Sequence, residues 1–176
     1  VIMIGESRDK ETMEAALRYA DTGHLCLTTL HATNAYQTLD RLLNFFPGDA
    51  HNQILMDLSL NLNCILAQRL VKTEAGKRVA AIEVMINTPY ISKLIRDGSF
   101  HEIRDIMEKG SDKNMRTFDQ SLLELYKAGK IDFKAALASA DSGSELEWKI
   151  NFGGGLKDAQ GEANTGDTLE FPDSSA

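Results

Sequence analysis

Two side chains with catalytic chemistry, Glu6 and His31, each follow a short apolar run. Glu6 comes two residues after "VIMI" at residues 1–4, and His31 directly follows "LCLTTL" at residues 25–30. If these runs are parallel strands, their carboxyl ends meet at one edge of a sheet, where ligands of open α/β folds bind. A carboxylate at that edge can hold a magnesium-bound water or orient a nucleophilic water, and an imidazole can donate to a phosphate oxygen.

Each of these two residues also has a purely structural explanation. Glu6 can cap the helix that follows it or pair with Arg8, and a histidine in a turn is more often structural than catalytic. The sequence alone leaves both alternatives open. The matching position of the two residues at two strand ends is what supports the functional interpretation.

No phosphate-binding loop occurs in the sequence. There is no GxxxxGK[ST] pattern, so no segment is suited to hold the β- and γ-phosphates of a nucleotide. The glycine cluster "FGGGLKD" at residues 152–158 is not followed by a helical pattern, and we do not expect it to bind phosphate. A chain that starts within a strand and lacks this loop is expected to be the second half of a nucleotide-binding domain.

The elements that would position Glu6 and His31 form a strand–helix–strand unit. "VIMIG" is typical of a strand that is buried on both faces of a parallel sheet. "RDKETMEAALRYADTG" predicts a helix with regularly spaced apolar residues and with Gly23 as its stop signal. A second strand at 24–31 completes a βαβ unit with a right-handed crossover. The expected fold class is α/β, with a mostly parallel sheet.

The rest of the chain predicts a hairpin and then a helical region. Amphipathic stretches cover residues 34–46 and 49–70, and two strands at 68–73 and 78–86 flank a turn. From residue 89 to residue 140 the patterns are wholly helical. The composition then shifts to Gly, Asp, Ser and Asn, so residues 141–176 are expected to be a mostly disordered acidic tail. Within it, Trp148, Ile150 and Phe152 alternate as they would in a strand.

Charge and composition exclude several classes of function. The net charge is −7, but eight of the 26 acidic residues and only two of the 19 basic residues lie after residue 140, so residues 1–140 are nearly neutral. A nearly neutral body argues against nucleic acid as the main partner, because phosphate binding needs a basic face. No segment approaches the ~20 apolar residues of a membrane span. Cys26 and Cys64 form no CxxC pair, so we expect buried, reduced thiols and no zinc site.

Two long ordered motifs resemble those of the secretion-type hexameric ATPases of the P-loop class. "IGESRDKET" at residues 4–12 resembles their Walker B segment, and "TGHLCLTTLHATNA" at residues 22–35 resembles their His box. The similarity continues through "AQRLV", "AAIEVMINTP" and "NMRTFDQSLLELYKAGKI" and covers about residues 1–140. A short turn replaces the four-cysteine zinc module of assembly ATPases, so the chain is most similar to the type IV pilus retraction ATPases, the PilT/PilU family. The helix "YISKLIRD", where the retraction motor has AIRNLIRE, and the acidic tail look like PilU.

The resemblance implies a role for each matching residue. The Walker B segment contributes Gly5, Glu6 and Arg8. Glu6 would orient the hydrolytic water and bind magnesium through a water molecule, and Arg8 would belong to an ion-pair network. The His box comprises Thr22, Gly23, His24, Thr29 and His31. Of these, His31 would contact the γ-phosphate and His24 would support the strand. The implied cofactors are ATP and Mg²⁺, and the Walker A lysine would lie outside this chain.

The resemblance also implies an organisation and a setting. Residues 1–88 would be the C-terminal half of a RecA-like ATPase core, 89–140 a helical subdomain and 141–176 the tail. The whole enzyme would be a hexameric ring at the cytoplasmic face of the bacterial inner membrane that hydrolyses ATP to retract type IV pili and drive twitching motility. Its partners would be an inner-membrane platform protein and a PilT paralogue, with no nucleic acid. Two alternatives stay open: an accessory module that modulates a PilT ring, and a pilus-assembly or type II secretion ATPase.

Overall fold

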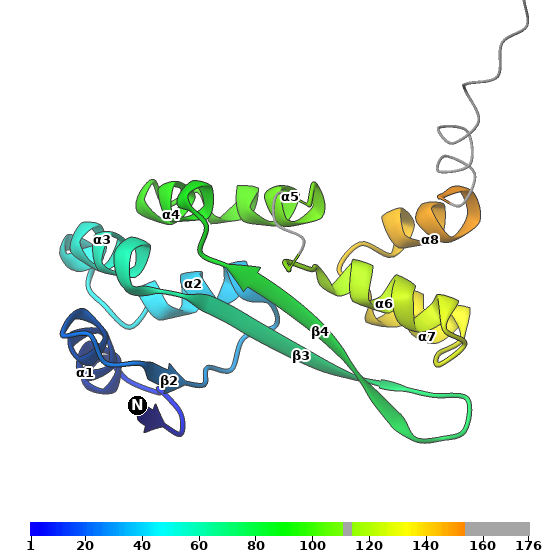
Figure 1. Cartoon of the computed structure of the whole chain (residues 1–176), viewed down its shortest axis with the longest axis horizontal. Helices are drawn as coiled ribbons and strands as arrows, with labels where there is room; N and C mark the ends of the chain where they lie inside the picture. The colour runs from blue at the N-terminus through cyan, green and yellow to red at the C-terminus, as the bar shows by residue number, and fades with distance from the viewer. Residues whose placement is uncertain (111–113, 154–176) are drawn as a thin grey trace, which may run out of the picture.

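Strands and helices both occur over the first half of the chain, and the elements described after residue 88 are all helices. The computed structural model describes residues 1–110 and 114–153 (Figure 1). Its elements are β1 (Ile2–Ile4), α1 (Lys10–Asp21), β2 (Cys26–Thr28), α2 (Ala35–Leu43), η1 (Gly48–Ala50), α3 (His51–Asn61), β3 (Cys64–Lys72), β4 (Arg78–Ile86), α4 (Pro89–Arg96), η2 (Phe100–Glu102), α5 (Ile103–Glu108), α6 (Phe118–Lys127), α7 (Phe133–Ser139) and α8 (Gly143–Phe152). None of the described helices is both long and apolar enough to cross a lipid bilayer.

The first three elements are the predicted βαβ unit. β1 and β2 pair in parallel, with Ile2 opposite Cys26. Asp9 is the N-cap of α1, and its side chain accepts a hydrogen bond from the Thr12 backbone amide at 2.8 Å. Gly23 follows the end of α1 at a φ of 87°, a conformation that residues with a Cβ rarely adopt. The α/β class and the parallel pair are therefore confirmed, but the expectation that β1 is buried on both faces is wrong, because Met3 is 72% exposed.

The longest strands form an antiparallel hairpin that runs through the middle of the molecule (Figure 1). The strands predicted at 68–73 and 78–86 are confirmed, but β3 begins earlier than expected, at Cys64. The amphipathic stretch predicted over 49–70 is therefore divided, because α3 ends at Asn61 and the remainder pairs with β4. A short apolar run is compatible with the helical and the strand period, and here the pairing partner decides between them.

A first hydrophobic cluster joins the βαβ unit to the first helices of the C-terminal region. α1, α2, α3 and β4 contribute to it, and so do α4 and α5. Its most buried members include Leu39, Met85, Ile91 and Ile103, each at most 1% exposed. Packing is thus continuous across the boundary expected at 88/89. That boundary stays a prediction.

A second hydrophobic cluster lies at the far end of the hairpin. Val71 of β3 and Ala81 of β4 pack there with Phe118 and Leu122 of α6 and with residues of α7 and α8. Figure 1 shows these three helices together on the side away from the β1–β2 pair. The helical patterns predicted after residue 89 are confirmed, and the hairpin connects the two clusters.

The expectation of a disordered tail from residue 141 is wrong for its first part. Residues 143–152 form α8, neither disordered nor a strand, and Leu146 is fully buried in the second cluster. An ion pair between Lys149 and Glu108 also ties α8 to α5. These tertiary contacts outweigh a local composition that is poor in large apolar residues. The rest of the predicted tail, residues 154–176, lies outside the described residues.

Replacing Leu146 by alanine should lower the free energy of unfolding by about 2–4 kcal/mol, because a fully buried side chain leaves a cavity. Denaturant unfolding followed by circular dichroism measures this change. Leu60→Ala is the matched control: Leu60 is 72% exposed on α3, so its loss should cost less than about 0.5 kcal/mol. Equally small effects of both variants would show that α8 is not part of the folded unit.

Candidate active site

The parallel strand pair brings Glu6 and His31 into direct contact. His31 Nε2 lies 2.7 Å from Glu6 Oε1. Glu6 follows the end of β1 by two residues and His31 follows the end of β2 by three, so the contact lies at the carboxyl ends of both strands. The Glu6 side chain is 19% exposed and that of His31 is 79% exposed, so neither is sealed inside an apolar core. The two residues lie together at one edge of the sheet, as the sequence predicted.

Hydrogen bonds between the two strand-end loops hold this edge together. The Ser7 amide donates to the Thr29 carbonyl at 3.0 Å, so the backbone pairing between the two segments continues beyond the ends of β1 and β2. The Thr29 hydroxyl donates to the Gly5 carbonyl at 2.5 Å, and the Ser7 hydroxyl lies 2.8 Å from that of Thr28. Gly5 and Thr29 thus stabilise the backbone that carries Glu6 and His31. Ser7, whose role was not predicted from the sequence, is 3% exposed and takes part in the same hydrogen bonds between the two loops.

Arg8 engages the second oxygen of the Glu6 carboxylate. Its Nε and one terminal nitrogen lie 2.6 and 2.5 Å from Oε2. This hydrogen bond is the largest cause that lowers the pKa of Glu6 below its usual value, and the charge of Arg8 acts in the same direction. Glu6 is therefore ionised at neutral pH. The ion-pair network expected for Arg8 consists here of Arg8, Glu6 and His31.

The residues of the site could supply only a small part of the ligand shell of a magnesium ion. Within residues 1–110 and 114–153, no three His, Cys, Asp or Glu side chains are grouped so that they could hold a metal ion. Mg²⁺ that is bound together with a nucleotide usually takes only one or two carboxylates from the protein, and phosphates and waters complete its shell. The ionised carboxylate of Glu6 could be one such protein ligand. Every other ligand would have to come from the nucleotide, from water or from groups beyond these residues.

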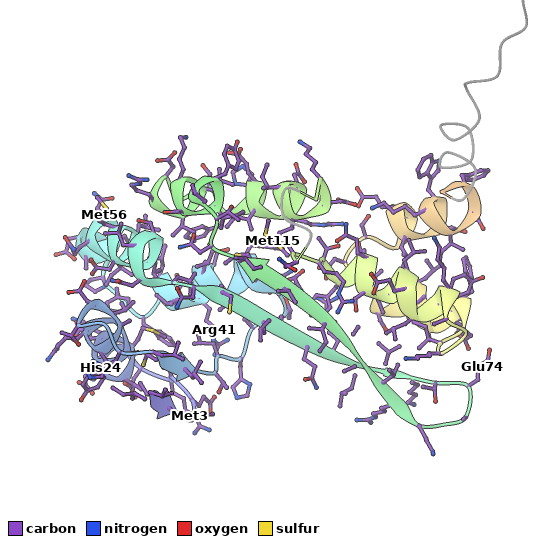
Figure 2. The ribbon with its side chains drawn as sticks, in the orientation of Figure 1. Met3, His24, Arg41, Met56, Glu74 and Met115 are labelled. Carbon is purple, nitrogen blue, oxygen red and sulfur yellow. The ribbon has the colours of Figure 1, made fainter. Side chains whose placement is uncertain are left out.

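The first half of the predicted His box lies at the other end of β2. The Thr22 hydroxyl donates to the Tyr19 carbonyl at 3.0 Å and lies 3.1 Å from Nδ1 of His24. The His24 ring packs edge-on against the Tyr19 ring, with the centroids 6.2 Å apart. Together with Gly23, these residues close α1 at the amino end of β2, where Figure 2 labels His24. His31 follows the carboxyl end of the same strand. This placement suits the supporting role expected for His24.

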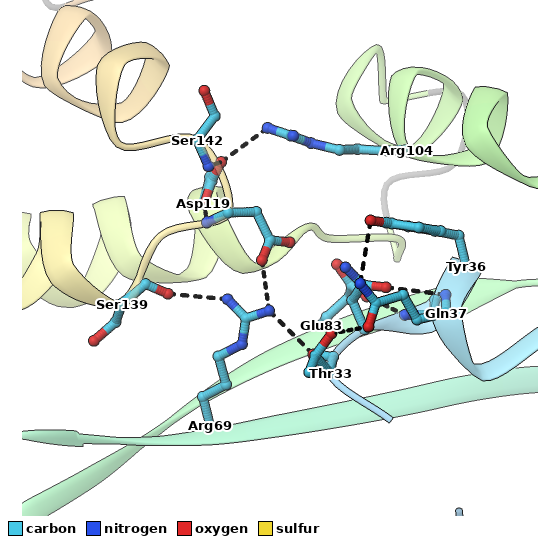
Figure 3. A network of polar contacts seen from close by, with 12 residues as sticks. Thr33, Tyr36, Gln37, Arg69, Glu83, Arg104, Asp119, Ser139 and Ser142 are labelled. Carbon is cyan, nitrogen blue, oxygen red and sulfur yellow. Dashed lines mark hydrogen bonds and ion pairs between the residues drawn. The ribbon is translucent and has the colours of Figure 1, made fainter. Parts of the chain in front are cut away.

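Behind the loop that carries His31 lies a polar network to which the sequence analysis gave no role (Figure 3). The Glu83 carboxylate of β4 is 3% exposed and accepts a hydrogen bond from the Ala35 amide, at the start of α2, at 2.7 Å. Burial is the largest cause that raises the pKa of Glu83, and the Ala35 hydrogen bond opposes it. Arg69 of β3 donates to the Thr33 carbonyl of the same loop at 3.0 Å. One signal was available: both are charged residues inside apolar runs, "ILAQRLV" and "VAAIEVMI".

Residues 1–113 match the model of a protein family described as "Type II/IV secretion system protein". The matched region contains the Walker B-like segment, the His-box-like segment and the elements β1 to α5. It therefore includes the whole of the candidate site, together with the strands that position it.

Individual relatives agree with this match. The chain is 53% identical over 154 residues to the "Type IV pilus ATPase PilU" of Pseudomonas aeruginosa, which covers 87% of this chain and 40% of that protein. It is 39% identical over 140 residues to the "Type IV pilus retractation ATPase PilT" of the same organism, which covers 80% and 41%. Among solved structures, the "Crystal Structure of the Pilus Retraction Motor PilT and Bound ADP" superposes with a TM-score of 0.75 at 38% identity, over 83% of this chain and 41% of that one. The chain thus spans about 40% of the length of these relatives.

Replacing Arg8 by methionine should raise the pKa of Glu6 toward its usual value, because the largest cause of its lowering is removed. A carbon-13 NMR titration of the glutamate side-chain carboxyls measures this change. Lys93→Met, which removes a cation from the surface pair with Asp97, is the matched control and should leave the pKa of Glu6 unchanged. An unaltered Glu6 titration in the Arg8 variant would contradict the assigned cause.

The same pKa shift sets the direction of a pH effect on stability. The pKa of Glu6 is lower in the folded chain than in the unfolded chain, so ionised Glu6 stabilises the folded state. This stabilisation is fully present above the unfolded-state pKa. It is lost as the pH falls through the lowered folded-state value. The wild type should therefore be more stable than Arg8→Met at neutral pH, and this difference in the free energy of unfolding should shrink as the pH falls through the acid range.

Proposed function

Since this chain belongs to the type II/IV secretion system protein family, and within it to the PilT/PilU group of pilus ATPases, we propose that its Glu6–His31 pair forms one wall of an ATP-hydrolysing site. The observation that carries the proposal is the 2.7 Å contact between these two side chains at the carboxyl ends of parallel strands. This edge is where open α/β sheets bind their ligands.

The two side chains offer complementary chemistry for phosphoryl transfer to water. An ionised Glu6 accepts hydrogen bonds, so it can orient the attacking water and take up its proton. His31 can donate from Nε2 to a phosphate oxygen in place of its present contact with Glu6. Magnesium, when bound, neutralises charge on the phosphates. Arg8 keeps Glu6 ionised and oriented, and we assign it no contact with the nucleotide.

A phosphate-binding loop must come from outside these 176 residues. The sequence contains no GxxxxGK[ST] pattern, and backbone amides of such a loop normally cradle the β- and γ-phosphates. The Glu6–His31 edge alone presents one carboxylate and one imidazole to a highly charged nucleotide. We infer that hydrolysis needs a polypeptide that carries these residues together with such a loop.

The finer biological role that we propose is pilus retraction. In this proposal the chain is part of a hexameric ring at the cytoplasmic face of the inner membrane, which works with a pilus platform protein and a PilT paralogue and drives twitching motility. The 53% identity to a pilus ATPase and the 39% identity to a pilus retractation ATPase support it. The hairpin turn at 73–77 also supports it, because this turn is too short to hold the cysteine module of the assembly branch.

One observation favours the second candidate, an accessory module that docks on an active motor. On α4, the positions that differ from the retraction ATPase helix include Tyr90, which is 50% exposed, and Lys93, whose side chain is 63% exposed. The apolar positions Ile91 and Ile95 of the same helix are fully buried. Tyr90 and Lys93 thus lie on an outward surface, where they could alter binding to another protein, whereas the third difference, Ser92, is half-buried and donates to the Ser59 carbonyl at 2.7 Å.

Glu6→Gln should lower the rate of ATP hydrolysis about 100-fold or more in a polypeptide that combines these residues with a phosphate-binding loop, because a carboxylate that activates water is lost. Steady-state kinetics should show the loss in kcat, with nucleotide binding retained. Glu14→Gln, which alters a surface pair with Lys10, is the matched control and should keep wild-type activity. Normal hydrolysis by Glu6→Gln would contradict the catalytic proposal, and normal motility in cells that carry it would favour the accessory module.

The 176 residues alone should show no measurable ATP turnover, because they contain no GxxxxGK[ST] loop to cradle the β- and γ-phosphates. A phosphate-release assay on the purified chain, with and without magnesium, tests this expectation. Turnover that depends on magnesium and disappears in Glu6→Gln would refute it.

A further inference from the structure

Arg69 connects two parts of the chain that are far apart in sequence. Its guanidinium donates to the carbonyl of Thr33 at 3.0 Å and to the carbonyl of Ser139 at 3.0 Å, and it pairs with Asp141 at 2.5 Å. The guanidinium also lies 4.0 Å from the centroid of the Phe118 ring. The Arg69 side chain is 24% exposed, so most of it is enclosed by these partners.

One end of this connection is the loop that carries His31. Thr33 lies two residues after His31, and the next residue, Asn34, caps α2 by accepting from the Gln37 amide at 3.0 Å. The Ala35 amide is held by Glu83. Two hairpin side chains therefore fix the point at which this loop enters α2. The His31 side chain in the same loop is 79% exposed, and its ion-pair partner among the described residues is Glu6.

The other end of the connection is the linker between α7 and α8. Asp119 of α6 is 3% exposed and accepts hydrogen bonds from the backbone amides of Asp141 and Ser142, at 2.8 and 3.1 Å. Arg104 of α5 pairs with Asp119 (Figure 3). It also pairs with Glu145 on α8. The linker is thus held to the second hydrophobic cluster on one side and to Arg69 on the other.

We propose that Arg69 is a positioning residue that sets the place of the His31 loop and couples it to the α7–α8 linker. The proposal rests on the proposed function only where it concerns hydrolysis. A guanidinium is a planar fork whose donors have fixed directions, so it can serve the three acceptors only while these keep their relative positions. A shift of Thr33 when His31 meets a phosphate therefore strains or breaks the bonds to Ser139 and Asp141. Lysine carries its three donors on a single nitrogen, so it cannot reproduce the spread of the planar fork over these acceptors.

The coupling can be tested without nucleotide by amide hydrogen exchange in the 176-residue chain. Asn34→Ala loosens the loop end by removing the α2 cap, and the amides of Asp141 and Ser142 report on the linker. With Arg69 present, Asn34→Ala should speed exchange at these amides roughly threefold or more. Arg69→Met alone should speed it about tenfold, and Asn34→Ala should then add nothing.

Two further variants separate a specific coupling from general loosening. Arg69→Lys should restore only part of the protection at the linker amides, because one ammonium replaces a fork. Arg116→Met removes an arginine of similar exposure whose ion-pair partner among the described residues is Glu124 on α6, and it should leave exchange at both ends unchanged. The proposal is overturned if Asn34→Ala leaves the linker amides unaffected in the wild type, or if it affects them equally in the wild type and in Arg69→Met.

The link to hydrolysis has a separate readout. In a polypeptide with a phosphate-binding loop, Arg69→Met should lower kcat at least about tenfold and leave the KM for ATP nearly unchanged, because Arg69 positions His31 but does not touch the nucleotide. An unchanged kcat, or a loss confined to KM, overturns this part of the proposal. Absence of hydrolysis in the unmodified polypeptide contradicts the proposed function instead, and the exchange experiment still decides the coupling.

Discussion

Parallel pairing between β1 and β2 is the interaction on which the candidate site depends. Each strand is only three residues long, yet the pairing fixes both carboxyl ends at one edge. The Ser7 amide continues it beyond the strands by bonding to the Thr29 carbonyl. If the register slipped by one residue, every side chain of one strand would change faces. Glu6 and His31 would then no longer leave the sheet side by side.

The chemistry of the edge follows from how the Glu6 carboxylate is shared. One oxygen meets His31 and the other meets Arg8, so the group is held in place, ionised and still partly open to solvent. A carboxylate in that state suits a water or the hydration shell of a hard cation better than a protonated or buried acid would. The hairpin behind it adds rigidity, since Arg69 and Glu83 fix the loop that carries His31.

The sequence was sufficient for features that depend on local patterns. Apolar runs followed by Glu6 and His31 predicted two parallel strands and a shared edge, and the structure places both residues there. Local patterns were insufficient where the deciding contacts come from distant residues. α8 forms because Leu146 is buried in a cluster that includes Phe118 and Leu122, more than twenty residues earlier. The charges of Arg69 and Glu83 inside apolar runs marked the polar network, but its contacts could not be predicted, since Arg69 meets Thr33 and Asp141 at separations of 36 and 72 residues.

The central claim is that β1 and β2 present Glu6 and His31 together to the terminal phosphate of a nucleotide. A crystal structure of a polypeptide with these residues and a phosphate-binding loop, bound to magnesium and a non-hydrolysable ATP analogue, tests it most directly. We predict that His31 Nε2 lies within hydrogen-bond distance of a γ-phosphate oxygen, and that the Glu6 carboxylate contacts a water beside the γ-phosphate or on the metal ion. A nucleotide bound elsewhere, with the contact between Glu6 and His31 unchanged, would contradict the account.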